Sequence, residues 1–199
     1  MAGIRTIGVI GAGTMGNGIA HVSARAGLRV LLYDVDNTAL YRGLDTIRAN
    51  MAREVAKQKL TVEEAEEARS RIVLTTSLDD LVPAELVIEA ATERFAVKSE
   101  IFRGLDRLLP AGAVLASNTS SISITMLAAV TKRPGQVIGM HFFNPVPVMQ
   151  LVEVIRGLQT TQETLDMVHA LAVRLGKTPL GAINASLRSA SEIRSACLL

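Results

Sequence analysis

Short, nearly continuous apolar runs recur along the chain, separated by segments in which apolar residues return with helical spacing. A strand buried on both faces of a parallel sheet has this continuous apolar pattern, because helices cover both of its faces. Strands that alternate with helices favour an α/β fold with a doubly wound, mostly parallel sheet. The predicted strands are Ile7–Ile10, Arg29–Asp34, Arg71–Thr75, Glu85–Ala90, Ala113–Ser117, Gln136–His141 and Leu151–Ile155, and Lys177–Leu180 begins another.

One connection, between the second and third predicted strands, is long and itself helical. Asn37–Lys59 has helical spacing, and Thr61 with Glu64 forms the pattern of a capping box that opens a second, acidic helix through Arg69. We therefore predict a helical arm, residues 37–70, inserted into the sheet domain. Its apolar stripe is Leu40, Leu44, Ile47, Met51 and Val55, and its basic residues include Arg48, Arg53, Lys57 and Lys59. Composition alone favours a solvated charged face over an arm that holds a phosphorylated ligand.

A glycine-rich turn follows the first predicted strand in the pattern G-x-G-x-x-G, with Gly11, Gly13 and Gly16. The first glycine allows a tight turn, the second lets backbone approach a pyrophosphate, and the third lets the next helix pack closely on the strand. Asp34 ends the second predicted strand 18 residues after Gly16, where a carboxylate can bind an adenosine ribose. The pattern predicts a Rossmann-like domain that binds NAD rather than NADP, since a carboxylate repels a 2′-phosphate. The alternative is a glycine turn in a domain that binds no nucleotide.

Polar side chains follow further predicted strands, at the edge where ligands bind in such sheets. Glu93 lies just past one strand, and Lys98 lies in the first turn of the next predicted helix, where a cation is unfavourable for the helix dipole. The segment Ala116–Ser121 is a burst of hydroxyl and amide side chains after a buried strand. It fits a turn and helix cap and a set of ligand-binding hydroxyls equally well.

One histidine and one glutamate form the strongest candidate for acid–base chemistry. His141 ends a predicted strand, and Asn144-Pro145 with Pro147 stiffens the turn that follows. Glu153 lies in the middle of the next apolar strand, where a carboxylate is costly unless it is paired. Across the turn, His141 is the obvious partner. A histidine held by a carboxylate suits a general base near neutral pH.

The composition narrows the class of protein. The chain has 199 residues, of which 49% are hydrophobic, enough for one α/β domain with a full core. With 21 Lys and Arg against 19 Asp and Glu, we expect no nucleic-acid partner. No apolar run is long enough for a membrane span, no room is left for a signal or transit peptide, and Cys197 is the only cysteine. We therefore expect a cytoplasmic protein without a membrane partner.

Three stretches together resemble the NAD-binding domain of the L-3-hydroxyacyl-CoA dehydrogenases, including the bacterial 3-hydroxybutyryl-CoA dehydrogenases. They are Val9–Gly16, Ala116–Ser121, and His141–Met149 with Leu151–Glu153. The resemblance implies an NAD-dependent oxidoreductase that interconverts 3-hydroxyacyl-CoA and 3-oxoacyl-CoA, with NAD as cofactor and an acyl-CoA as substrate. We expect no metal ion. Two alternatives stay open: an NAD-binding remnant without catalysis, and a related dehydrogenase of a small hydroxy acid without CoA.

The resemblance also implies roles for individual residues. His141 takes the proton of the 3-hydroxyl group while hydride passes to the nicotinamide, Glu153 orients His141, and Ser120 hydrogen-bonds the substrate oxygen. Lys57 matches a lysine that contacts CoA, and Asn50 stands where some relatives carry a serine. This reverses the preference for a merely solvated arm. The implied NAD contacts are Gly11, Ala12, Gly13, Thr14, Met15, Gly16, Asp34, Glu93, Lys98 and Asn144.

The similarity ends near Leu180. In this family a segment Pro-Gly-Phe-Val-x-Asn-Arg follows, its asparagine belongs to the active site, and a helical domain then closes the substrate cleft and forms the homodimer. Asn184 has the wrong neighbours to take that asparagine's role. We therefore expect an NAD-binding domain over residues 1–181 and a divergent tail over residues 182–199 in place of the dimer-forming domain. A truncated or frame-shifted product is the hypothesis that follows.

Overall fold

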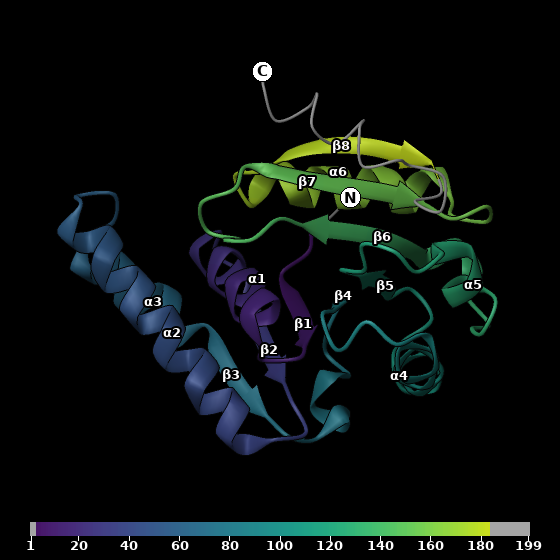
Figure 1. Ribbon diagram of the computed structural model, residues 1–199, viewed down its shortest axis with the longest axis horizontal. Helices are drawn as coiled ribbons and strands as arrows, with labels where there is room; N and C mark the ends of the chain where they lie inside the picture. The colour runs from purple at the N-terminus through teal and green to yellow at the C-terminus, as the bar shows by residue number, and fades with distance from the viewer. Residues whose placement is uncertain (1–2, 184–199) are drawn as a thin grey trace.

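The computed structural model describes residues 3–183, which fold as strands and helices in the predicted order (Figure 1). The strands are β1 (Thr6–Ile10), β2 (Arg29–Tyr33), β3 (Ile72–Thr75), β4 (Leu86–Glu89), β5 (Val114–Ser117), β6 (Val137–Phe142), β7 (Leu151–Arg156) and β8 (Thr178–Ile183). The helices are α1 (Thr14–Arg25), α2 (Asn37–Ala56), α3 (Val62–Ser70), α4 (Phe95–Leu108), α5 (Ile124–Ala128) and α6 (Gln162–Arg174), with 3-10 turns at Leu78–Leu81 and Pro134–Gln136. Of the predicted divergent tail, residues 182 and 183 complete β8, and residues 184–199, including Asn184, lie outside the described residues.

The strands form one eight-stranded sheet in the order β3-β2-β1-β4-β5-β6-β7-β8. Strands β1 to β6 are all parallel, as the continuous apolar runs predict. β7 runs antiparallel to β6, and β8 runs parallel to β7, so the sheet is mostly parallel and the predicted fold class is confirmed. The chain moves outward from β1 through β2 to β3 and then returns to the other side of β1 with β4. Such a reversal opens a crevice at the carboxyl ends of β1 and β4, where ligands bind in open α/β sheets.

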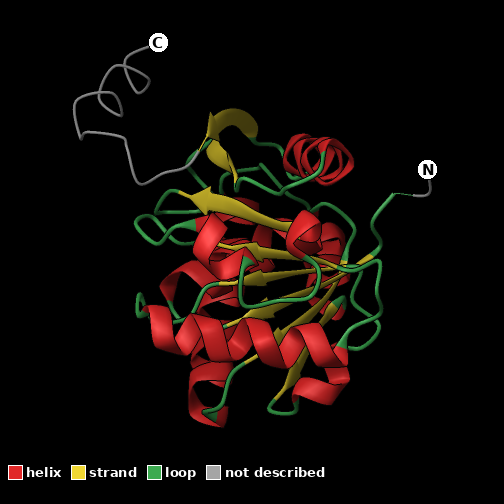
Figure 2. Cartoon of the chain, turned by 90° about the vertical axis from the view of Figure 1, so that its right-hand side faces the viewer, coloured by secondary structure: helices red, strands yellow, loops and turns green. Residues whose placement is uncertain are grey.

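Helices cover both faces of the sheet (Figure 1, Figure 2). α1, α2, α3 and α6 pack on one face, where Ile19 of α1 and Val168 of α6 share a buried cluster with Val9 of β1. α4 and α5 pack on the other face, where Phe102 of α4 lies in a second cluster with Leu115 of β5. This double cover explains why the strands lack a polar face. Within residues 3–183, none of these helices has the length and apolar character needed to traverse a lipid bilayer.

The predicted helical arm consists of α2 and α3, which project at the left of Figure 1. The carboxylate of Asp36 caps α2 by accepting a hydrogen bond from the Thr38 N–H at 2.8 Å. The predicted capping box of α3 is present: Thr61 Oγ1 accepts from the Glu64 N–H at 3.1 Å, and Glu64 Oε2 accepts from the Thr61 N–H at 2.8 Å. Of the predicted stripe, Leu40, Ile47 and Met51 are buried, and Leu44 and Val55 are half-buried. The arm therefore attaches to the sheet domain through one apolar face.

One helix is absent from the predictions. The short helix α5 follows the polar segment 117–121, and Ser123 caps it by accepting from the Met126 N–H at 3.4 Å. The cap thus lies two residues beyond the polar segment. A helix of five residues carries too little periodicity to be recognised from the sequence alone.

Candidate active site

The glycine turn between β1 and α1 has the geometry that a dinucleotide needs. Gly11 has a φ of +95°, and a side chain there would meet the carbonyl oxygen of Ala90 at 2.8 Å. A Cβ at Gly16 would lie 1.6 Å from the Gly11 oxygen, so only glycine permits this close packing. A Cβ at Gly13 would have no heavy atom within 4 Å among the described residues. Gly13 therefore exposes backbone to open space at the N-terminus of α1, a site suited to a pyrophosphate.

Asp34 lies beside this turn, at the end of β2. Its Oδ2 accepts a hydrogen bond from the Ala12 N–H at 2.8 Å, and its Oδ1 accepts from the Asp36 N–H at 3.0 Å. Asp34 thus braces the glycine turn, a role in addition to the predicted ribose contact. A carboxylate has about four acceptor positions, so both roles are compatible. The open backbone at Gly13 and the adjacent carboxylate fit NAD, and the individual contacts stay predictions.

His141 and Glu153 meet as the sequence predicted. They face each other in register on the antiparallel strands β6 and β7. His141 Nδ1 lies 2.9 Å from Glu153 Oε2, and the two side chains are 17% and 10% exposed. A carboxylate at this distance holds the tautomer in which Nδ1 carries the proton, which leaves Nε2 as the nitrogen that exchanges protons. The pair can therefore act as a general base with access to the surface.

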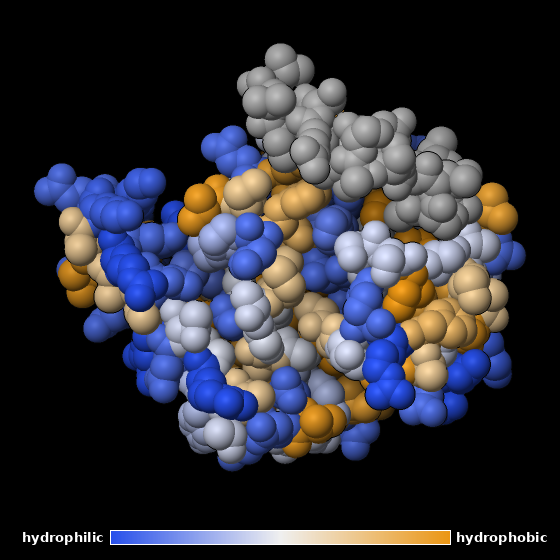
Figure 3. All heavy atoms as spheres, in the orientation of Figure 1, coloured by the Kyte–Doolittle hydropathy of each residue, from blue (hydrophilic) through white to orange (hydrophobic). Residues whose placement is uncertain are grey.

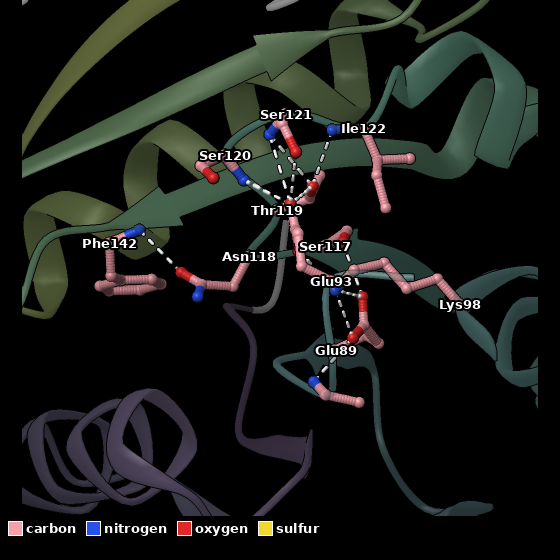
Figure 4. A network of polar contacts seen from close by, with 11 residues as sticks. Glu89, Glu93, Lys98, Ser117, Asn118, Thr119, Ser120, Ser121, Ile122 and Phe142 are labelled. Atoms are coloured by element: carbon pink, nitrogen blue, oxygen red, sulfur yellow. Dashed lines mark hydrogen bonds and ion pairs between the residues drawn. The ribbon is translucent and has the colours of Figure 1, made fainter. Parts of the chain in front are cut away.

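The polar segment 117–121 forms a loop that Glu93 holds in place (Figure 4). Glu93 Oε1 accepts hydrogen bonds from the Ser120 N–H at 3.1 Å, from the Ser121 N–H at 3.3 Å and hydroxyl at 3.1 Å, and from the Thr119 hydroxyl. Burial raises the pKa of Glu93, but the hydrogen bond from Thr119 and the charge of Lys98 outweigh it and hold that pKa below 4.5. Glu93 is therefore an ionised carboxylate whose hydrogen bonds hold the loop that carries Ser120.

A side-chain amide ties this loop to the strand that bears His141. Asn118 Oδ1 accepts a hydrogen bond from the Phe142 N–H at 2.8 Å (Figure 4). Asn118 also donates its own N–H to the carbonyl of Glu89 at 2.8 Å. Ser120 and His141 thus belong to neighbouring segments at the carboxyl ends of β5 and β6. The segment forms a turn in which the Thr119 hydroxyl also accepts from the Ile122 N–H at 2.9 Å, and a ligand-binding role for its hydroxyls stays a prediction.

Lys98, which the resemblance assigns to the NAD site, is a buried side chain paired with carboxylates. It is 1% exposed, and its Nζ lies 2.7 and 2.9 Å from the two carboxylate oxygens of Glu89 and 3.3 Å from Glu93 Oε2. These carboxylates offset the unfavourable position of a cation in the first turn of α4. Sequence reasoning missed Glu89, although Glu89 ends an apolar strand and the criterion applied to Glu153 would have found it.

The loop after His141 is held by a lysine that the sequence did not single out. Lys177 Nζ donates hydrogen bonds to the carbonyls of Val146 at 2.5 Å and Met149 at 2.7 Å. Burial and the nearby charge of Arg25 lower the pKa of Lys177. Asn144 begins this loop and is exposed. The carbonyl partners lie 28 and 31 residues before Lys177, so no local pattern revealed them.

A basic cleft of about 720 Å³ borders the same loop rather than His141 itself. It contains both residues of the arm that the resemblance assigns to CoA, Asn50 and Lys57, and Pro147 with Val148 forms an apolar wall. The surface of the arm is mostly hydrophilic (Figure 3). The cations that line the cleft are Arg25, Arg53, Lys57, Lys59, Arg174 and Lys177, against one acid, Glu54. The basic face of the arm therefore belongs to a cleft that suits an anionic ligand with an apolar part.

Comparison with known proteins agrees with this geometry. Residues 6–185 match the family model "3-hydroxyacyl-CoA dehydrogenase, NAD binding domain". The chain is 52% identical to a 3-hydroxybutyryl-CoA dehydrogenase of Bradyrhizobium diazoefficiens over 87% of this chain and 59% of that protein. It is 47% identical to a 3-hydroxyadipyl-CoA dehydrogenase of Escherichia coli over 90% of this chain and 38% of that protein.

Solved structures give the same result. The crystal structure of an (S)-3-hydroxybutyryl-CoA dehydrogenase from Ralstonia eutropha superposes with a TM-score of 0.89 and 50% identity, over 91% of this chain and 64% of that chain. The chain thus spans about three fifths of the length of such relatives. It contains an NAD-binding domain and belongs to the 3-hydroxyacyl-CoA dehydrogenase family.

Proposed function

We propose that the protein is an NAD-dependent dehydrogenase that interconverts 3-hydroxyacyl-CoA and 3-oxoacyl-CoA, of the 3-hydroxybutyryl-CoA type. The observation that carries the proposal is the His141–Glu153 pair, 2.9 Å apart, beside the loop that bears Ser120. A pair of this kind at the same edge of the sheet as a nucleotide turn supplies a base that can take the proton of a hydroxyl group as hydride leaves. Family membership supports the reaction class.

Each residue of the site has one task in this reaction. His141 Nε2 accepts the proton of the 3-hydroxyl group, and Glu153 stabilises the imidazolium that forms. The Ser120 hydroxyl donates a hydrogen bond to the substrate oxygen, and Glu93 holds the Ser120 backbone in place. When bound, NAD accepts the hydride from C3 of the substrate. The glycine turn and Asp34 hold the dinucleotide.

The basic cleft is the proposed CoA site. Lys57 and Asn50 line it, and the loop that follows His141 forms one of its walls, so an acyl-CoA can enter from the cleft. The phosphates of CoA carry several negative charges, and six cations line the cleft. A small hydroxy acid would leave most of this charge unused, which favours a CoA ester as substrate.

The test is oxidation of NADH by acetoacetyl-CoA with the purified chain, together with calorimetric titration of NAD+. We expect turnover that His141→Ala abolishes, and His169→Ala on α6 is the control histidine variant. NAD+ binding without turnover would support the alternative of a non-catalytic NAD-binding domain. Turnover of a small hydroxy acid without binding of CoA esters would support the other alternative.

A further inference from the structure

Glu89 is a buried carboxylate whose hydrogen bonds join two loops of the ligand edge. It is 0% exposed at the end of β4 and lies in register with Ser117 of β5. Its Oε1 accepts from the Ala91 N–H and from Lys98 Nζ, both at 2.7 Å. Its Oε2 accepts from Lys98 Nζ at 2.9 Å and from the Ser117 hydroxyl at 2.6 Å. Glu89 thus fixes the start of the β4 loop and the start of the β5 loop at once.

Lys98 connects this buried carboxylate to an exposed one. Its Nζ lies 3.3 Å from Oε2 of Glu93, whose side chain is 41% exposed. The other oxygen of Glu93 accepts the hydrogen bonds from the loop of Ser120. A continuous series of charged contacts therefore runs from the interior of the sheet to Ser120 (Figure 4).

The location of this ion pair is informative, because a buried ion pair contributes little net stability compared with an apolar pair of similar size. Such pairs are best explained where they impose a particular arrangement. Glu89 and Lys98 lie beneath two loops of the ligand edge and not in the middle of the core. Glu93 has an exposed side chain, and its contact with Lys98 connects it to the interior of the sheet.

We propose that Glu89 is a positioning residue: through Lys98 and Glu93 it fixes the loop that carries Ser120 and orders the adjoining edge of the NAD site. The assignment of Ser120 to the substrate rests on the proposed function. The order of the loop and the affinity for NAD+ do not require turnover, so both can be measured in a chain that is inactive.

The first test is amide hydrogen exchange of residues 118–122 in Glu89→Gln. We expect the Ser120 and Ser121 amides to exchange about tenfold faster, although Glu89 contacts neither of these amides, and to be accelerated more than the amides of β2. Glu85→Gln is the matched control, because Glu85 precedes the same strand and accepts from the Arg5 and Thr6 amides at the opposite edge of the sheet. Equal acceleration throughout the chain, or none at residues 118–122, would overturn the proposal.

The second test is calorimetric titration with NAD+. If Glu89→Gln displaces the loops at the edge of the NAD site, the Kd for NAD+ should rise about tenfold at unchanged stoichiometry. A merely structural role would instead lower the stoichiometry at unchanged Kd, because part of the protein would be unfolded, and that result contradicts the proposal.

If Glu89→Gln does not fold, Ser117→Ala removes a single hydrogen bond of the same carboxylate. Here we expect about threefold faster exchange at Ser120 and Ser121. Unchanged exchange in that variant would also contradict the proposal.

Discussion

Two carboxylates at the same edge of the sheet, Glu153 and Glu89, each lie in an apolar strand and are each paired with a basic side chain. The two pairs differ in the partner and in how far they are exposed. Each carboxylate has a nitrogen partner at less than 3 Å. Glu153 pairs with His141, and both side chains keep some exposure, 10% and 17%. Glu89 pairs with Lys98, and these side chains are 0% and 1% exposed.

The difference separates chemistry from positioning. A proton donor or acceptor must reach its substrate, which a partly exposed histidine can do. A positioning charge must not move, which favours a fully buried lysine with two hydrogen bonds to one carboxylate. We therefore expect substitutions in the first pair to reduce the rate and substitutions in the second to reduce stability and order.

The largest effect is expected from Lys98→Met. Removing the ammonium leaves the Glu89 carboxylate buried without its counter-charge, and such changes cost about 3–5 kcal/mol of unfolding free energy. The double variant Glu89→Gln, Lys98→Met removes both charges and should recover much of this loss. Urea unfolding of the two single variants and the double variant measures the coupling. Additive losses would mean that the two side chains do not act as a pair.

Next in size is the effect of Glu153→Gln on catalysis. In a chain that turns over, kcat should fall about 10²–10³-fold, because the amide cannot stabilise the imidazolium of His141. The unfolding free energy should change much less than in Lys98→Met, since the pair is partly exposed. Steady-state kinetics with acetoacetyl-CoA and NADH measures it, with Glu163→Gln on the exposed start of α6 as control. A rate close to that of the unaltered chain would remove Glu153 from the site.

A second histidine tests whether exposure decides the behaviour of such a pair. His21 is 0% exposed, with Glu54 Oε2 at 3.4 Å, and Arg25 and Lys177 lie near. Burial lowers its pKa below 6.5 and outweighs the opposing effect of Glu54. The unfolded chain therefore takes up a proton first, so stability is full above pH 6.5 and falls as the pH drops toward the folded pKa.

The variant His21→Gln should remove this dependence on pH. Urea unfolding at about pH 7.5 and about pH 5.5 measures it, and His169→Gln should keep the full pH dependence. An equal slope in His21→Gln would show that another group causes the loss of stability below pH 6.5.

The smallest effect is expected from Glu93→Gln. The pKa of Glu93 lies below 4.5 in the folded chain, so its contribution is present above pH 4.5 and is lost as the pH falls through the folded pKa. Its side chain is 41% exposed, and solvent screening keeps the contribution to within about 1 kcal/mol. The variant should lower the unfolding free energy at pH 7 by no more than about 1 kcal/mol and flatten the stability curve between about pH 5 and pH 3. A loss at pH 7 as large as that of Lys98→Met would contradict the distinction between buried and exposed carboxylates.

The features that could be predicted from the sequence are those that depend on residues close together in the chain. The apolar runs predicted the eight strands, the glycine spacing predicted the turn after β1, and Thr61 with Glu64 predicted the cap of α3. His141 and Glu153 could be paired because they are 12 residues apart across one turn between adjacent strands. Local spacing is enough to predict such a contact.

The order of the strands in the sheet, and the contacts between residues at their ends, became known only from the folded chain. Glu89, Lys98 and Ser117 come from β4, α4 and β5, and Glu93 reaches Ser120 across 27 residues. The basic cleft forms because the arm, α1, and the loop held by Lys177 converge. A continuous apolar run shows that both faces of a strand are buried, but it carries no information on the order of the strands in the sheet. That order, set by the packing of helices on both faces, brought the network of Glu89 beneath the loop of Ser120.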